Sequence, residues 1–81
     1  MAMSKYRDFL FDLGFELAAR ALDARRARDE NSATGEDRRF QEGRLLAFNE
    51  VISLMQQQAT GLGIDLSELR LAEIDPDRDL V

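Results

Sequence analysis

The stretch DENSATGED, residues 29–37, separates two long segments of helical character and decides the fold. Its first half, residues 29–33, is polar and is typical of a turn. Its second half has the form of a capping box, with Thr34 as N-cap and Asp37 at the third helical position. The stretch therefore predicts a helix on each side of one turn.

The flanking segments predict helices over about residues 5–29 and 35–60, the first capped by Ser4 and the second ended by Gly61 or Gly63. At about 100° per residue, each helix carries one main apolar stripe. On the first helix the stripe consists of Tyr6, Leu10, Leu13, Leu17, Ala21 and Ala24. On the second helix it consists of Phe40, Ala47, Val51, Leu54 and Met55, with Gly43, Arg44 and Gln58 on the same side.

Folding the chain about Ser32 places these two main stripes against each other. The expected pairs are Ala24 with Phe40, Ala21 with Gly43, Leu17 with Ala47, Leu13 with Val51, Leu10 with Leu54, and Tyr6 with Gln58. Small residues face each other near the turn, so the helices are expected to approach closely there. The prediction is an all-α fold, an antiparallel two-helix hairpin.

The apolar arc of each helix is wider than the roughly 100° that one neighbouring helix covers. A chain of 81 residues also has a thin core, and without Cys or His it has neither disulfides nor the commonest metal ligand. Self-association is the remaining stabilising device. We therefore expect a homodimer that forms a four-helix bundle. The candidate dimer interface is the flanking stripe of each helix, namely Phe11, Phe15, Leu22, Leu45, Phe48 and Ile52.

Two polar residues, Arg44 and Gln58, share the apolar side of the second helix. Polar groups there are costly unless they are paired or lie near an edge. In one interpretation Arg44 extends past the apolar seam into solvent. In the other, both residues pair across the dimer interface and set its register, as buried polar residues do in coiled coils.

After Gly63 the pattern changes to a short apolar helix over about residues 66–72, opened by Asp65, and an acidic tail over residues 75–81. This segment has two interpretations. It plugs the open end of the bundle, or it binds a basic partner through complementary charge. The candidate partner-binding residues are Leu66, Leu69, Ile74, Asp75, Asp77 and Asp79.

Other chemistries find little support in the sequence. Without His there is no di-iron motif of the Glu-x-x-His kind. The carboxylates Asp8, Asp12 and Glu16 lie opposite the apolar stripe and indicate a solvated helix face. Residues 75–79 imitate the start of a calcium loop, but Leu80 stands where such a loop needs Gly. We therefore expect no cofactor, no metal and no catalytic residues.

Seven arginines gather near the turn, namely Arg20, Arg25, Arg26, Arg28, Arg38, Arg39 and Arg44. Six acids share that stretch, which favours local ion pairs over nucleic-acid binding. Residues 45–81 hold two arginines against seven acids and so carry the whole excess of the −5 net charge. The longest apolar stretch contains Asp12 and Glu16, which excludes a membrane span.

The sequence thus predicts one all-α domain over residues 1–81, cytoplasmic in location, that acts as a non-catalytic homodimeric protein–protein interaction module. An adaptor, a regulator's partner and an inhibitor are all roles of this class. The first alternative is a nucleic-acid-associated regulator that uses the arginine-rich turn end. The second is an all-α enzyme that depends on carboxylates and Mg²⁺.

Overall fold

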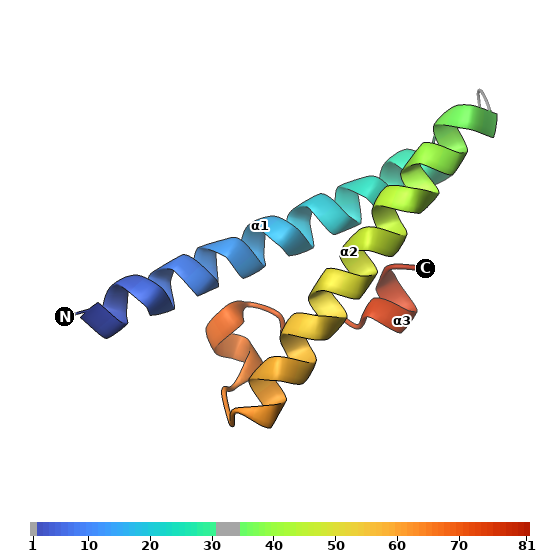
Figure 1. The fold of residues 1–81 in the computed structure, drawn as a ribbon. Helices are drawn as coiled ribbons and strands as arrows, with labels where there is room; N and C mark the ends of the chain where they lie inside the picture. Colours follow the sequence, from blue (N-terminus) through green and yellow to red (C-terminus); the bar gives the residue numbers. More distant parts are fainter. Residues whose placement is uncertain (1, 31–34) are drawn as a thin grey trace.

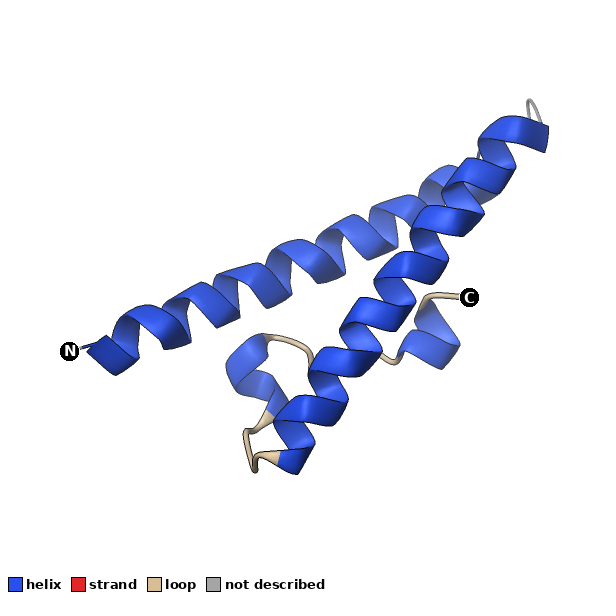
Figure 2. Cartoon of the chain, in the orientation of Figure 1, coloured by secondary structure: helices blue, strands red, loops and turns tan. Residues whose placement is uncertain are grey.

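The computed structural model is a hairpin of two long antiparallel helices with a folded C-terminal segment beside it (Figure 1). The elements in chain order are α1 (Ala2–Glu30), α2 (Gly35–Gly61), the 3-10 helix η1 (Leu66–Leu69) and α3 (Pro76–Asp79). The structure describes residues 2–30 and 35–81, and within this part of the chain no strand is present (Figure 2). The predicted all-α helical hairpin is confirmed.

Most of the predicted helix ends agree with the structure. Gly63 has a φ of 71°, and its N–H donates to Thr60 O (3.2 Å) while the Ile64 N–H donates to Ala59 O (2.8 Å). This pair of bonds is the Schellman arrangement that ends many helices at a glycine. The start of α1 differs: the helix already begins at Ala2, so Ser4 lies inside it rather than at its N-cap. Of the turn predicted over residues 29–33, Asp29 and Glu30 belong to α1 instead, while residues 31–33 and the Thr34 cap lie outside the described residues.

The face that α2 buries is not the predicted one. Its flanking stripe forms the core, with Leu45 2% exposed, Ile52 0% and Ala59 3%. Most of the predicted main stripe is instead open to solvent, with Phe40 65% exposed, Val51 43% and Leu54 56%, while Met55 packs partly buried against the core. The predicted pairing of the two main stripes is therefore wrong for α2.

The physical reason is the C-terminal segment, which we define as residues 62–81. Its element η1 contacts both long helices, which are close at the turn and diverge from there (Figure 1). At Gly14 of α1 the approach is so close that a Cβ atom would overlap the carbonyl oxygen of Leu69. Leu69 and Leu71 fill the space between the helices and join the same core as Ile52. Because these side chains enter from one flank, α2 turns its flanking stripe toward them.

Two amide side chains of α2 hold the C-terminal segment by its backbone. Asn49 Nδ2 donates to Pro76 O (2.9 Å) and to Leu80 O (3.4 Å). Gln56 Nε2 donates to the carbonyl oxygens of Leu71 (3.0 Å) and Ile74 (2.8 Å). A segment with so little regular structure has carbonyls without helical partners, and these bonds satisfy three of them, while Pro76 O also accepts the Leu80 N–H of α3.

The segment departs from its predicted secondary structure in two places. The helix expected over residues 66–72 is only the 3-10 helix η1, which ends at Arg70 in the left-handed conformation (φ 55°). The expected acidic tail over residues 75–81 contains the helical turn α3, with Asp75 as N-cap and Pro76 at the first helical turn. Leu80, directly after α3, is 1% exposed and belongs to the core.

The predicted close approach at Ala21 and Gly43 is half right. Ala21 is fully buried in the core. Gly43 is exposed, and a Cβ atom added to it would meet nothing within 4 Å. The glycine that permits close approach is Gly14, and its neighbour is η1 rather than α2.

The two helix-interior glycines provide a matched test of this packing. Gly14→Ala places a methyl group against the Leu69 carbonyl and should lower the free energy of unfolding by about 1–3 kcal/mol or more. Gly43→Ala adds the same atom in open space and should raise it by about 0.5–1 kcal/mol through helix propensity. Thermal melts of the two variants measure both effects. Equal shifts in the same direction would contradict the placement of η1.

Candidate functional site

The most conspicuous feature of the surface is a set of large apolar side chains on the two long helices. We call one group of them the open face and define it as the exposed side chains of Tyr6, Leu10, Leu13, Phe40, Ala47, Val51 and Leu54. Tyr6 is 70% exposed, and even the least exposed large member, Leu13, reaches 36%. These are residues of the two main stripes.

On α2 the open face points away from the C-terminal segment. Asn49 and Gln56, which bind that segment, are seven residues apart and so lie on one side of the helix. At about 100° per residue, Val51 and Leu54 lie roughly 150–210° around the axis from them. The C-terminal segment therefore covers one side of α2 and leaves the opposite side bare.

On α1 the division is less sharp, because Phe11 and Phe15, on the side of the C-terminal segment, are still 36% and 48% exposed. The guanidinium of Arg70 lies over the rings of Phe11 (5.0 Å to the centroid) and Phe15 (4.6 Å). Tyr6 and Leu13 lie roughly 160–180° around the helix from those two rings. The open face is thus the side of the hairpin opposite the C-terminal segment.

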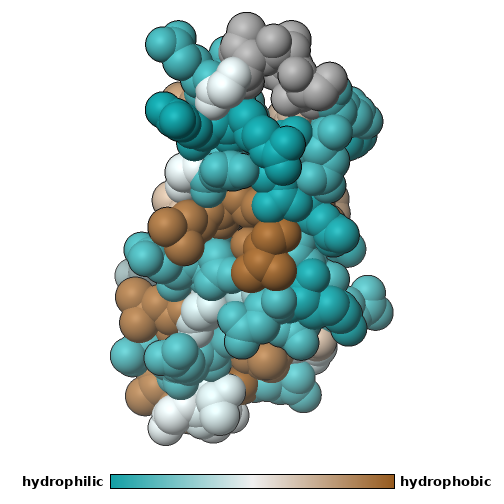
Figure 3. All heavy atoms as spheres, turned by 90° about the vertical axis from the view of Figure 1, so that its right-hand side faces the viewer, coloured by the Kyte–Doolittle hydropathy of each residue, from teal (hydrophilic) through white to brown (hydrophobic). Residues whose placement is uncertain are grey.

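The space-filling view gives the character of one side of the molecule. Figure 3 looks at the right-hand side of Figure 1, where apolar side chains interrupt the polar surface across its middle and lower part. The upper part, where the two long helices meet, is hydrophilic. On this side of the molecule, the exposed apolar side chains lie below the upper end of the hairpin.

The predicted dimer interface requires correction. Leu45 and Ile52 are buried in the chain's own core and have no area left for a second chain. Phe48 is half-buried against the same core. The three predicted interface residues of α1 stay exposed: Phe11 by 36%, Phe15 by 48% and Leu22 by 45%, with the Arg70 guanidinium over the two phenylalanine rings. The flanking stripes were expected to be free because periodicity alone could not show where the C-terminal segment packs.

The predicted register residues occupy different surroundings. Arg44 is half-buried, donates to Gln41 Oε1 (2.9 Å) and lies over the Phe48 ring at 5.8 Å from the centroid. Gln58 is exposed on the side of α2 that carries the open face. Both residues therefore lie beside the open face, Arg44 between Phe40 and Ala47 and Gln58 one turn beyond Leu54.

The apolar members of the predicted partner-binding segment belong to the fold. Leu69 is 6% exposed, and Leu66 and Ile74 pack against the core as partly buried residues. This is the arrangement expected if the segment plugs the end of the hairpin, which was the first of its two interpretations.

The acidic residues of that segment organise α3. Asp75 Oδ1 accepts the Asp77 N–H (3.0 Å), and Asp79 Oδ2 accepts the Asp75 N–H (2.9 Å). Arg78 donates to Asp79 through Nε and a terminal nitrogen, both at 2.8 Å. The Arg78 bonds, followed by the bond from the Asp75 backbone, hold the pKa of Asp79 well below its usual range. Asp77 is exposed.

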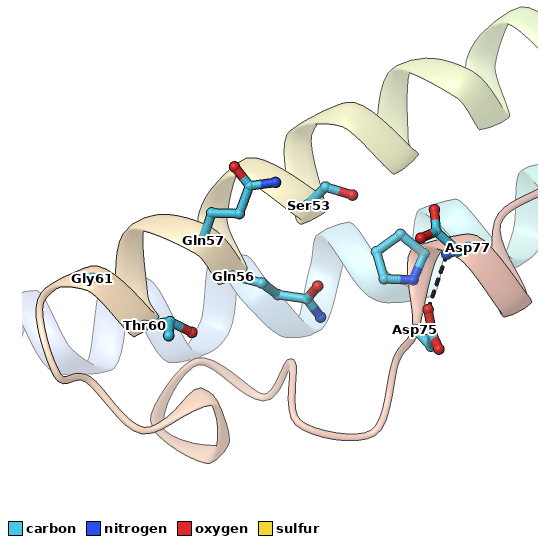
Figure 4. Close-up of a pocket in the computed structure, with 8 residues that line it drawn as sticks. Ser53, Gln56, Gln57, Thr60, Gly61, Asp75 and Asp77 are labelled. Carbon is cyan, nitrogen blue, oxygen red and sulfur yellow. Dashed lines mark hydrogen bonds between the residues drawn. The ribbon is translucent and has the colours of Figure 1, made fainter.

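A polar hollow of about 570 Å³ lies between α2 and the start of α3. Its lining residues are Ser53, Gln56, Gln57, Thr60, Gly61, Asp75, Pro76 and Asp77 (Figure 4). Gln56 binds backbone carbonyls of the C-terminal segment, and Asp75 caps α3. These two polar groups hold the fold together.

The arginines near the turn are largely engaged in ion pairs. Arg20 pairs with Glu16, Arg25 and Arg28 with Asp29, Arg26 with Asp23, and Arg38 with Glu42. Arg25 also donates to the backbone carbonyl of Asp79 (3.3 Å). Such pairs stabilise little individually, but they neutralise the positive charge that a phosphate backbone would require.

Within residues 2–30 and 35–81, no group of three or more acidic side chains is placed to hold a metal ion. Over the same residues, neither long helix is apolar enough along its length to cross a bilayer. Comparison of the chain with protein-family models, with curated proteins and with solved structures finds no match.

Asn49 and Gln56 are the residues that sequence reasoning missed. They do not border the main apolar stripe of α2, and an amide that binds a backbone far along the chain has no local signature. Their spacing of seven residues was the available signal, because it places two amides on one side of a helix.

The bonds of Asp79 predict a dependence of stability on pH. An Asp in the unfolded chain has a pKa of about 3.9, and folding lowers that of Asp79. Because folding lowers its pKa, the ionised Asp79 carboxylate stabilises the folded chain above about pH 4. This stabilisation is lost as the pH falls toward the pKa that Asp79 has in the folded chain. Asp79→Asn should therefore melt below the wild type at pH 7, and this difference should shrink toward pH 2.

Asp77→Asn is the matched control on the same turn and should follow the wild type. A difference between Asp79→Asn and the wild type that is equal at pH 7 and pH 2 would contradict this role.

Proposed function

We propose that the chain is a non-catalytic helical interaction module that acts as a homodimer, with the open face as the surface shared by two copies. The observation that carries the proposal is the exposure of Phe40, Val51 and Leu54 on a helix whose opposite side is already covered. Soluble monomers rarely leave contiguous apolar patches larger than a few hundred Å² open to water.

The size of the open face supports a dimer. From their exposed fractions, its six large residues present roughly 600 Å² per chain to solvent. A standard specific interface buries about 800 Å² per partner. With the polar residues around the rim, the open face therefore has the area that a stable dimer needs.

The charges support a protein partner over nucleic acid. Five of the arginines near the turn are already paired with carboxylates of the same chain. The net charge of −5 adds a general repulsion from phosphate backbones. Nothing on the open face requires a cofactor, and its chemistry is that of helix packing.

Two leucines of α2 offer a matched test. Leu54 belongs to the open face and is 56% exposed, whereas Leu46 is 61% exposed on another side of the same helix. Leu54→Glu places a charge in the proposed interface of both copies and should weaken the dimer by about a hundredfold or more. Leu46→Glu should leave the dimer intact. Sedimentation equilibrium at micromolar concentrations measures both.

The same measurement on the unmodified chain is the control. A single species of 9.2 kDa across the concentration range would refute the dimer. Equal weakening by Leu54→Glu and Leu46→Glu would show that the two chains meet on another surface.

A further inference from the structure

The open face of α2 has the spacing of a helix-packing seam. Phe40, Arg44, Ala47, Val51, Leu54 and Gln58 follow one another at alternating intervals of four and three residues. This is the heptad spacing that keeps a row of side chains facing a second helix over its whole length. We call this row the α2 seam.

The α2 seam contains two polar interruptions, and they constrain any helix that covers it. Burying Arg44 or Gln58 against an apolar surface would leave hydrogen-bonding groups without partners, which is costly. Arg44 uses one terminal nitrogen for Gln41, and a guanidinium carries five N–H groups in all. The Arg44 guanidinium therefore has N–H groups left for a further acceptor, and the side-chain oxygen of Gln58 can accept a hydrogen bond.

We infer that two copies of α2 pack antiparallel along this seam, with the two-fold axis of the homodimer passing beside Val51. In an antiparallel two-fold pair, each residue faces the one that lies equally far on the other side of the axis. Val51 is midway between Arg44 and Gln58, so this axis makes the two polar residues mutual partners. A parallel pair would instead place the two Arg44 side chains together, and their like charges repel. The inference rests on the proposed homodimer.

The same axis has a second consequence that was not used to choose it. It places Phe40 of one copy opposite Leu62 of the other, because each lies eleven residues from Val51. Phe40 is 65% exposed and Leu62, directly after α2, is 73% exposed. The centre of the seam holds the smaller side chains of Ala47 and Val51, and small residues let two helices approach closely. This axis thus pairs the polar side chains of Arg44 and Gln58, and it also pairs the large apolar side chains of Phe40 and Leu62.

Single cysteines test the position of the axis, because the chain has no Cys of its own. Val51→Cys places two thiols side by side at the axis, within the 4.4–6.8 Å between Cα atoms that a disulfide spans. Ala47→Cys is the matched control on the same seam. In the antiparallel pair its two copies lie eight residues apart along the axis, about 12 Å, and cannot be bridged. Oxidation followed by non-reducing electrophoresis measures both.

The expected result is a covalent dimer for Val51→Cys and little or none for Ala47→Cys. Crosslinking of both variants, of neither, or of Ala47→Cys alone would overturn the inference. Where sedimentation still shows a dimer, such a result leaves the proposed function standing with a different geometry. A monomeric unmodified chain would overturn both.

The partnership of Arg44 and Gln58 gives an independent measurement. Gln58→Glu should tighten the dimer by about two- to fivefold at low salt, since it replaces a neutral acceptor by a charged one opposite Arg44. Gln57→Glu adds the same charge at the neighbouring exposed position, off the seam, and should not tighten it. Equal effects of the two variants on the dissociation constant would contradict the pairing.

Discussion

The contact between Gly14 of α1 and the Leu69 carbonyl of η1 is the constraint on which the rest of the structure depends. A side chain at position 14 would keep the C-terminal segment away from α1. With a glycine there, Leu69 and Leu71 enter between the diverging helices and complete a core with Ile52 and Leu45. That core is small, in a molecule 49 Å long and only 16 Å across its thinnest direction. A chain of this size has little apolar area in reserve, so the placement of one short segment decides which helix faces remain open.

The proposed function depends on which helix faces the C-terminal segment leaves open. Asn49 and Gln56 hold the C-terminal segment on one side of α2, and the opposite side keeps Val51 and Leu54 in solvent. On α1, the Arg70 guanidinium lies over the rings of Phe11 and Phe15, which stay 36% and 48% exposed. The surface that we propose for a second copy is the side of α2 opposite the segment. In this proposal the position of the segment determines which side of α2 is available for association.

The features that depend only on neighbouring residues could be predicted from the sequence. The two long helices, a stop at Gly61 or Gly63 and the cap at Asp65 were predicted from propensity, turn residues and side chains that bind nearby backbone groups, and the positive φ identifies Gly63 as the stop. The buried face of α2 could not be predicted in this way. That helix carries two apolar stripes, and periodicity does not say which stripe meets a partner. The choice is made by residues 66–80, which are distant in sequence. Gly14 is an isolated glycine inside the first helix. Such a glycine often has a packing reason, so a close approach of another backbone could have been inferred there.

The C-terminal segment is part of the core and sets the packing of the hairpin. A chain that ends after Gly63 tests this role, with the thermal unfolding of the truncated and the full chain followed by circular dichroism. The truncated chain lacks Leu69, Leu71 and Leu80, each of which is at most 6% exposed. We predict that it loses the cooperative transition of the full chain, because Ile52, Leu45 and Ala59 would face water. A cooperative transition within a few degrees of that of the full chain would show that the hairpin does not need the C-terminal segment for its core.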